Sequence, residues 1–276
     1  MECKVRDLNV YYEEAGSGRP ILMLHGWGGD HHYLFHHMEP MFTNRVGWRR
    51  LYLNLPGHGK TRSAEWITSQ DHILDVVLEF MDAIAPGERF VITGMSVGGH
   101  VARGVVHHRA SQLDGLLLLV PAIVVEEGKR KVPQHRVLRE DTKFLASLTP
   151  EEQELRRIYV AQSMAVLEVF RNTLAPAFAV ADYGFLARIK QSFTFDVDKL
   201  AEPFPAPTLF LTGRYDPWVG YQNAFEILDN YPRGTYTVMD LAGHGLAEEQ
   251  QTLFRVLVSE WLDRVEEYGA IANPRV

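Results

Sequence analysis

A serine flanked by glycines constrains the fold of this chain more than any other feature. Residues 94–98 read Gly-Met-Ser-Val-Gly, the mostly apolar residues 89–93 before them predict a buried strand, and residues 100–106 after them predict the start of a helix. A serine on a turn from strand to helix is held in a strained conformation that projects its hydroxyl out of the backbone. The flanking glycines let strand and helix pack closely. We therefore expect Ser96 at the end of a strand in an α/β sheet.

Two later loops carry the partners that a nucleophilic serine needs. The base would be a histidine, which in turn needs a carboxylate to orient it. Residues 207–212 and 235–239 each predict a strand, and Asp216 and His244 follow just beyond their ends. Catalytic groups collect beyond the strand ends of an open α/β sheet. Ser96, Asp216 and His244 are therefore the predicted nucleophile, orienting acid and general base.

Other carboxylates compete for the role of the acid. Asp240 precedes the histidine closely, but it is too near the base in sequence to reach it easily. Glu126 and Glu127 follow an earlier predicted strand and are weaker alternatives. Asp216 is favoured, because in the ordered set of serine, acid and histidine it lies on a loop after a late strand, where the acid of this fold is expected.

The remaining pattern predicts a mostly parallel sheet covered by helices on both faces, with an insertion. Strand-like and helix-like segments alternate up to residue 123, after two short antiparallel edge strands expected within residues 5–14. Residues 124–200 contain no strong strand. Within them Thr149 and Pro150 predict a helix start, and helical spacing of apolar residues continues to Phe170. We expect core segments at 1–123 and 201–276, separated by a helical insertion at 124–200.

The chain resembles the α/β-hydrolase superfamily, serine-nucleophile branch, from end to end. The likeness rests on the Ser96 and Asp216–His244 segments above, on residues 25–29 (His-Gly-Trp-Gly-Gly) and on residues 55–59 (Leu-Pro-Gly-His-Gly). Residues 212–216 and 219–221 are similar to bacterial members whose substrates are mostly unassigned. The resemblance implies that the insertion is a cap over the active site. It also implies that the Trp27 and Val97 N–H groups form an oxyanion hole, the Val97 N–H lying at the helix start. His25 is expected to brace the Trp27 loop.

These features predict a hydrolase that cleaves an ester, thioester or related acyl bond of a small molecule through an acyl-enzyme. Carbon–carbon bond hydrolysis by the same three residues is an alternative, although Gly245 stands where that subgroup usually has tryptophan. Proline iminopeptidase patterns are absent, and epoxide hydrolases and dehalogenases need an acid where Ser96 lies. Acyl transfer remains open, as does a module that binds a small molecule with slow or no turnover.

Charge and cysteine content limit the remaining classes. The net charge of −7 argues against nucleic-acid binding, because no basic surplus exists to neutralise phosphates. The single Cys3 excludes an internal disulfide. Residues 116–125, the longest apolar run, are too short for a membrane helix, and the N-terminus lacks an apolar signal core. We expect a cytoplasmic protein without membrane attachment, and the sequence leaves its oligomeric state open.

A histidine cluster at His31, His32, His36 and His37 resembles a metal site. His32 and His36 are spaced to share one face of a helix, but no carboxylate stands at a third-ligand spacing, although Asp30 is adjacent. A partly exposed helical face is the favoured interpretation. We expect neither a metal nor a cofactor in the reaction.

Overall fold

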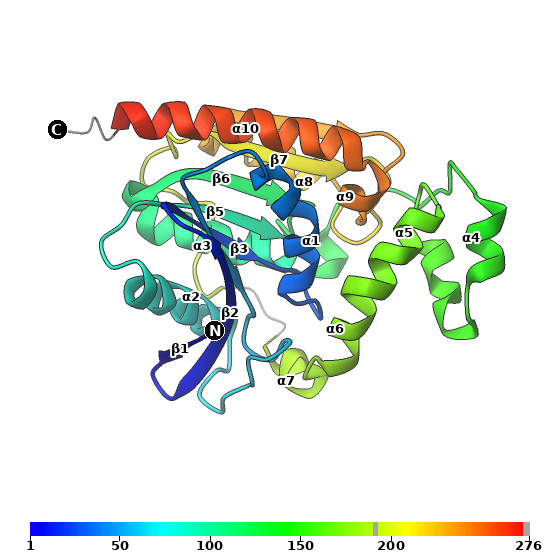
Figure 1. The fold of residues 1–276 in the computed structure, drawn as a ribbon, viewed down its shortest axis with the longest axis horizontal. Helices are drawn as coiled ribbons and strands as arrows, with labels where there is room; N and C mark the ends of the chain where they lie inside the picture. The colour runs from blue at the N-terminus through cyan, green and yellow to red at the C-terminus, as the bar shows by residue number, and fades with distance from the viewer. Residues whose placement is uncertain (190–192, 273–276) are drawn as a thin grey trace.

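The computed structural model describes residues 1–189 and 193–272 and places an eight-stranded sheet at the centre of the molecule (Figure 1). The strand order is β1-β2-β4-β3-β5-β6-β7-β8. The strands are β1 (Glu2–Val5), β2 (Leu8–Gly16), β3 (Arg19–Leu24), β4 (Trp48–Leu53), β5 (Phe90–Met95), β6 (Leu113–Leu119), β7 (Thr208–Gly213) and β8 (Gly234–Met239).

The sheet is parallel except at one edge. β1 pairs antiparallel with β2, and β2 pairs antiparallel with β4. All pairings from β4 through β3, β5, β6 and β7 to β8 are parallel. The edge hairpin begins and ends outside the expected residues 5–14, because pairing with β4 extends β2 to Gly16. The carboxyl ends of these six parallel strands therefore meet at one edge of the sheet, where ligand sites form in such folds.

Helices cover both faces of the sheet and bury one apolar cluster on each. α2 (Gln70–Ile84) and α3 (Val97–Arg109) pack on one face, and α1 (His31–Phe42) and α10 (Gln251–Ala272) on the other. The short helices α8 (Gln222–Glu226) and α9 (Leu246–Glu249) follow β7 and β8, with 3-10 turns at η1 (Ala110–Gln112) and η5 (Leu228–Asn230). No helix in the described parts of the chain is both long and apolar enough to cross a membrane.

The segment between β6 and β7 forms a separate helical strip beside the sheet, at right in Figure 1. We call residues 124–200 the inserted segment. Its elements are η2 (Glu127–Lys129), α4 (Thr142–Ser147), η3 (Pro150–Arg157), α5 (Met164–Val169), η4 (Phe170–Leu174), α6 (Ala175–Val180) and α7 (Tyr183–Arg188). A small apolar cluster around Phe144, Leu155 and Tyr159 holds the first part together.

One expectation for the inserted segment was wrong. Helical spacing from Thr149 to Phe170 predicted a continuous helix, but the structure forms the 3-10 helix η3, a non-helical stretch at 158–163, and then α5. The capping box at the start does form, between Thr149 and Glu152. The interruption has a tertiary cause, because Val160 bonds to other segments through both its N–H and its carbonyl group.

Candidate active site

Ser96 lies on the turn between β5 and α3 in a conformation that is rare for any residue except glycine. Its φ is 53° and its ψ is −117°, and its N–H donates to the Leu119 carbonyl at 3.0 Å. A Cβ at position 94 would overlap the Gly98 carbonyl, and a Cβ at position 98 would overlap the Leu24 carbonyl. The two glycines are thus required by close backbone packing, which holds the strained serine in place.

Asp216 and His244 meet beyond the ends of β7 and β8. Asp216 Oδ2 lies 2.7 Å from His244 Nδ1. The other carboxylate oxygen accepts from the N–H groups of Trp218 (2.9 Å) and Val219 (3.1 Å), and the carboxylate is fully buried. A carboxylate held in this way fixes the ring orientation and places the Nδ1 proton toward itself. His244 Nε2 is then the atom able to accept a proton.

Backbone pairing brings these two loops together. Arg214 N–H donates to the Met239 carbonyl at 2.9 Å, and Tyr215 N–H donates to the Ala242 carbonyl at 3.0 Å. Gly213 permits the approach, because a Cβ there would overlap the Gly243 carbonyl. Backbone pairing between β7 and β8 therefore continues past the strand ends into the loops that carry Asp216 and His244.

Ser96 and His244 line the same cavity, which has a volume of about 610 Å³. No hydrogen bond joins their side chains within the described part of the chain. Catalytic hydrogen bonds are often long before substrate binds. The presence of both side chains in one cavity therefore says more about whether they act together than the lack of a hydrogen bond does. Trp27 and Val97, the predicted oxyanion donors, line this cavity as well.

The competing carboxylates lie in three different environments. Asp240 is exposed, although it is only four residues before His244. Glu126 is exposed and pairs with Lys129. Glu127 lines the cavity wall, but the histidine ring bonds to Asp216. The carboxylate that bonds to the His244 ring is that of Asp216.

His25 braces the loop that carries Trp27. Its Nδ1 lies 2.8 Å from the Gly26 carbonyl, and its Nε2 accepts from the Leu55 N–H at 3.0 Å. Both ring nitrogens are thus engaged by the backbone, so the ring has no proton to exchange with a substrate. Burial and the neighbouring His58 ring hold the pKa of His25 well below its usual value. The pKa of His58 is lowered to about 4 by burial.

Glu249 joins the inserted segment to the loop that carries His244. Its carboxylate accepts from the N–H groups of Val160, Ala161 (3.0 Å) and Gly243 (2.6 Å). Two of these donors belong to the inserted segment, and the third directly precedes the base. Burial outweighs the three donors and raises the pKa of Glu249 to about 7. The carboxylate therefore holds the His244 loop and the inserted segment together.

Gly245 lets the inserted segment approach the base closely. A Cβ at this position would overlap the ring of Tyr159. A tryptophan directly after the histidine, as in the carbon–carbon hydrolases considered from the sequence, would therefore displace Tyr159. The indole beside the base comes instead from Trp218, whose ring centre lies 4.8 Å from that of His244.

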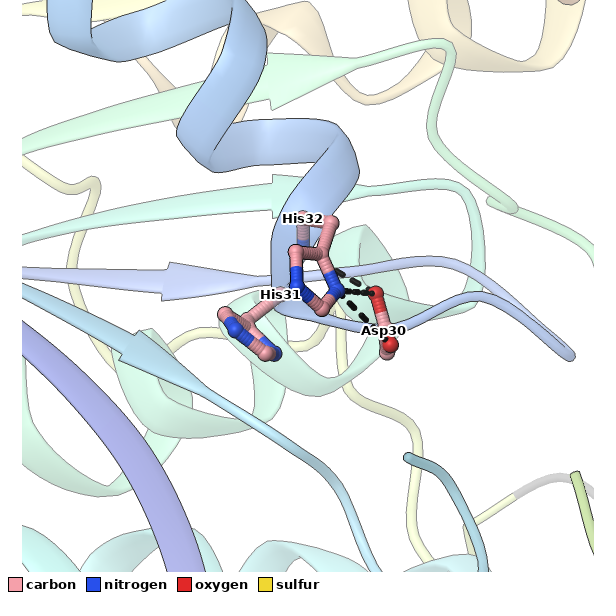
Figure 2. Close-up of side chains that lie close together, drawn as sticks. All are labelled: Asp30, His31 and His32. Carbon is pink, nitrogen blue, oxygen red and sulfur yellow. Dashed lines mark hydrogen bonds and ion pairs between the residues drawn. The ribbon is translucent and has the colours of Figure 1, made fainter. Parts of the chain in front are cut away.

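The histidine cluster separates into different environments in the structure. Figure 2 shows the group formed by Asp30, His31 and His32, whose possible ligand atoms lie within 4.8 Å of one another. Asp30 caps α1 by accepting from the His32 N–H. The ring of His31 lies 2.8 Å from Asn54 Oδ1 and 2.9 Å from Glu13 Oε2, so other side chains already engage both of its nitrogens. His37 is buried against Glu248, whereas His36 is exposed.

Sequence reasoning assigned no role to four buried polar residues that the structure places near the predicted catalytic residues. These residues are Gln70, His100, Glu248 and Glu249. The adjacent acids at 248 and 249, within an otherwise mostly apolar stretch after His244, were a sequence signal for buried carboxylates. Gln70 gives no such signal, because its burial depends on contacts with the inserted segment.

Known proteins are similar to this chain over most of its length. A family model described as serine aminopeptidase, S33, matches residues 18–251. The chain is 19% identical over 261 residues to a pimeloyl-(acyl-carrier protein) methyl ester esterase of Legionella pneumophila (strain Paris), covering 92% of this chain and 100% of that protein. It is 24% identical over 261 residues to a 2-hydroxy-6-oxo-6-(2'-aminophenyl)hexa-2,4-dienoic acid hydrolase of Metapseudomonas resinovorans, covering 92% and 87%.

A solved structure agrees over nearly the whole chain. The alpha/beta superfamily hydrolase from Oenococcus oeni PSU-1 superposes with a TM-score of 0.88 at 25% identity, covering 96% of this chain and 99% of that one. The match includes the inserted segment as well as the sheet, since so little of either chain is left out.

Proposed function

The chain belongs to the serine aminopeptidase S33 family of α/β-hydrolases, and from this membership we propose that it hydrolyses an acyl ester of a small molecule with Ser96 as nucleophile. The predicted α/β-hydrolase fold is confirmed by the family match and by the structural likeness. Esterases and a carbon–carbon bond hydrolase are among the relatives, and the names of these relatives support ester hydrolysis as the reaction class.

One observation carries the assignment of residues. A serine in a strained strand-to-helix turn opens onto the same cavity as a histidine whose Nδ1 is bound by a buried carboxylate. Glycine would adopt this backbone conformation at a lower cost in free energy, so a buried serine there is of no benefit to the fold and indicates a function. The combination supports a nucleophile, base and acid formed by Ser96, His244 and Asp216.

The chemistry follows from this arrangement. Ser96 Oγ attacks the ester carbonyl carbon while His244 Nε2 accepts the hydroxyl proton, and Asp216 stabilises the charged ring. The N–H groups of Trp27 and Val97 would stabilise the negative oxygen of the tetrahedral intermediate. Collapse of the intermediate breaks the bond to the alcohol, which takes the proton from His244. Water then repeats the sequence on the acyl-enzyme and releases the acid.

The inserted segment supports a role as a cap. Leu155, Phe170 and Phe178 come from it and line the cavity opposite Ser96 and His244. Their apolar side chains exclude water and favour an apolar acyl or alcohol group. We therefore assign residues 124–200 to a cap between the core segments 1–123 and 201–276.

Covalent labelling tests the proposal. The wild-type protein should react with a fluorophosphonate probe, and Ser96→Ala should neither be labelled nor turn over a panel of p-nitrophenyl esters. The loss in turnover is expected to be about 10⁶-fold. Labelling of the variant at the wild-type rate would place the nucleophile elsewhere, and a labelled wild type without ester turnover would favour a binding module.

Two chemical variants can be separated by product analysis. Transfer to an acceptor other than water would give a new ester or amide in the presence of alcohols or amines. Carbon–carbon bond hydrolysis would give turnover of a vinylogous diketone at a rate above that of the best ester. The low cysteine content supports a cytoplasmic location, and cell fractionation tests it.

A further inference from the structure

The contacts of His100 determine which of its two ring nitrogens carries the proton. It lies one turn beyond Ser96 on α3, is 2% exposed and lines the cavity. Its Nδ1 lies 3.1 Å from a guanidinium nitrogen of Arg103, which can only donate. Nδ1 must therefore be the unprotonated nitrogen, and in the neutral ring the proton lies on Nε2. Burial and Arg103 hold the pKa of His100 well below its usual value, so the ring stays neutral.

The Nε2–H of His100 has no partner among the described residues. One face of the ring is covered by Phe193, stacked at 4.2 Å. Arg103 is held by the carbonyls of Ala122 and Ile123, both at 3.0 Å, and by Asp198. A buried donor without a partner costs free energy, so a group that enters the cavity and accepts this hydrogen bond is stabilised.

Gln70 presents the complementary acceptor. Its side-chain NH₂ donates to the Ile189 carbonyl at 3.0 Å. A carbonyl can only accept, so the orientation of the amide is fixed and Oε1 is the free end. This oxygen is buried without a partner in the described part of the chain, and Gln70 lines the same cavity as His100.

The packing of the two helices brings Gln70 and His100 close together. α2 and α3 each precede the next parallel strand on one face of the sheet, so they run in the same direction. Leu74 and Gly104 are in contact between them, because a Cβ at position 104 would lie 2.8 Å from Leu74. Gln70 and His100 each lie four residues before this contact, and are therefore neighbours at the N-terminal ends of the helices.

We propose that Gln70 and His100 form a polar subsite that selects substrates carrying a hydroxyl group remote from the scissile ester. The hydroxyl oxygen accepts from His100 Nε2–H while its proton is donated to Gln70 Oε1. Arg103 and Ile189 are positioning residues, because they determine which atom of each side chain is free. A carboxylate is disfavoured, because Gln70 Oε1 would face it with no proton between them. The inference rests on the proposed ester hydrolysis and names its substrate class.

Three series of p-nitrophenyl esters test the subsite. One series ends in a hydroxyl, one in a methyl group and one in a methoxy group, at matched chain lengths. A hydroxyl donates and accepts, a methoxy group only accepts, and a methyl group does neither. At the best length we expect kcat/KM for the hydroxyl ester to exceed that for the methyl ester about tenfold.

Two variants separate the donor from the acceptor. His100→Phe should remove the preference over methyl for both the hydroxyl and the methoxy ester, a loss of about tenfold for the former. Gln70→Met should reduce the hydroxyl ester alone and leave the methoxy ester unchanged. His107→Phe is the matched control, because it makes the same change on α3 outside the cavity and should leave every ratio unaltered. Thermal melting verifies that each variant is folded.

A binding measurement keeps this inference separate from the proposed function. Calorimetry on Ser96→Ala, alone and combined with His100→Phe, measures the affinity for the intact hydroxyl and methyl esters. A preference that depends on His100 supports the subsite even if the wild type turns over no ester, an outcome that would refute only the proposed function. Equal affinities in Ser96→Ala at every chain length, or a preference retained in both His100→Phe and Gln70→Met, would overturn the subsite.

Discussion

The two walls of the cavity are built by different physical means. The core wall carries Ser96, Asp216 and His244 on the ends of paired strands, where regular backbone hydrogen bonds fix each loop. The wall from the inserted segment consists of short helices and turns, held to the core by single side chains such as Glu249. The inserted segment should therefore be more sensitive than the sheet to the loss of one buried side chain such as that of Glu249. Substitutions of side chains on the core wall should have the largest effect on the rate of the reaction. The dependence of stability on pH should arise where Glu249 joins the inserted segment to the core.

The largest effect is expected at the core wall, for Asp216→Asn. The amide would favour the wrong tautomer of His244, and kcat should fall by about 10⁴-fold while the fold is retained. Steady-state kinetics on a p-nitrophenyl ester measure the loss. The matched control is Asp240→Asn, an exposed aspartate on the same side of the base in sequence. An inactive control beside a nearly normal Asp216→Asn would show that the acid is misassigned.

The connection between the walls should give stability a dependence on pH. Burial raises the pKa of Glu249 to about 7 from 4.5, so the folded state holds a proton that the unfolded chain has lost between these values. The contribution of this carboxyl to stability is therefore complete below pH 4.5 and is lost as the pH rises through about 7. The loss in the free energy of unfolding is at most about 3 kcal/mol.

Urea denaturation at several pH values measures this contribution in comparison with Glu249→Gln, which resembles the protonated form. The wild-type curve should coincide with the variant curve below pH 4.5 and should fall below it as the pH rises through about 7. Glu126→Gln provides an exposed control. Parallel curves for wild type and Glu249→Gln would mean that Glu249 does not titrate in this range.

A pair of glycines sharpens the contrast in packing. Gly98→Ala forces a Cβ into the Leu24 carbonyl beneath the serine and should lower stability by about 1–3 kcal/mol. Gly184→Ala, in α7 of the inserted segment, meets only Asp182 Oδ1 at 3.5 Å and should raise stability by about 0.5–1 kcal/mol. Thermal unfolding compares them. Equal changes in stability for the two variants would show that packing around position 98 in the core is no tighter than packing around position 184 in the inserted segment.

The smallest effect is expected from a chelator. The proposed reaction uses three side chains and two backbone donors, and the rings of His31 and His32 already bond to neighbouring side chains. Activity after prolonged dialysis against a chelator should equal that of the untreated protein. A loss that zinc restores, and that His32→Ala abolishes, would instead establish a metal site at Asp30, His31 and His32.

Local signals in the sequence were enough to predict the sheet and the core wall. Alternating strands and helices, together with glycines around Ser96, predict a fold in which strand ends converge, so residues far apart in sequence were assigned to one site. The same reasoning did not predict the secondary structure of the inserted segment correctly. Its apolar spacing predicted one long helix, but backbone bonds to Glu249 and to the strand-like residues 138–139 interrupt it.

The sequence by itself determined the edge of the sheet where Ser96, Asp216 and His244 would lie, because this depends on local backbone geometry and strand direction. Only the tertiary structure decided which acid contacts His244, how Glu249 joins the two walls, and which atoms of Gln70 and His100 remain free. The physical reason is that the protonation and orientation of a buried polar group depend on its partners in space. For Gln70 and His100 the deciding partners are Ile189 and Arg103, and the former lies far away in the sequence.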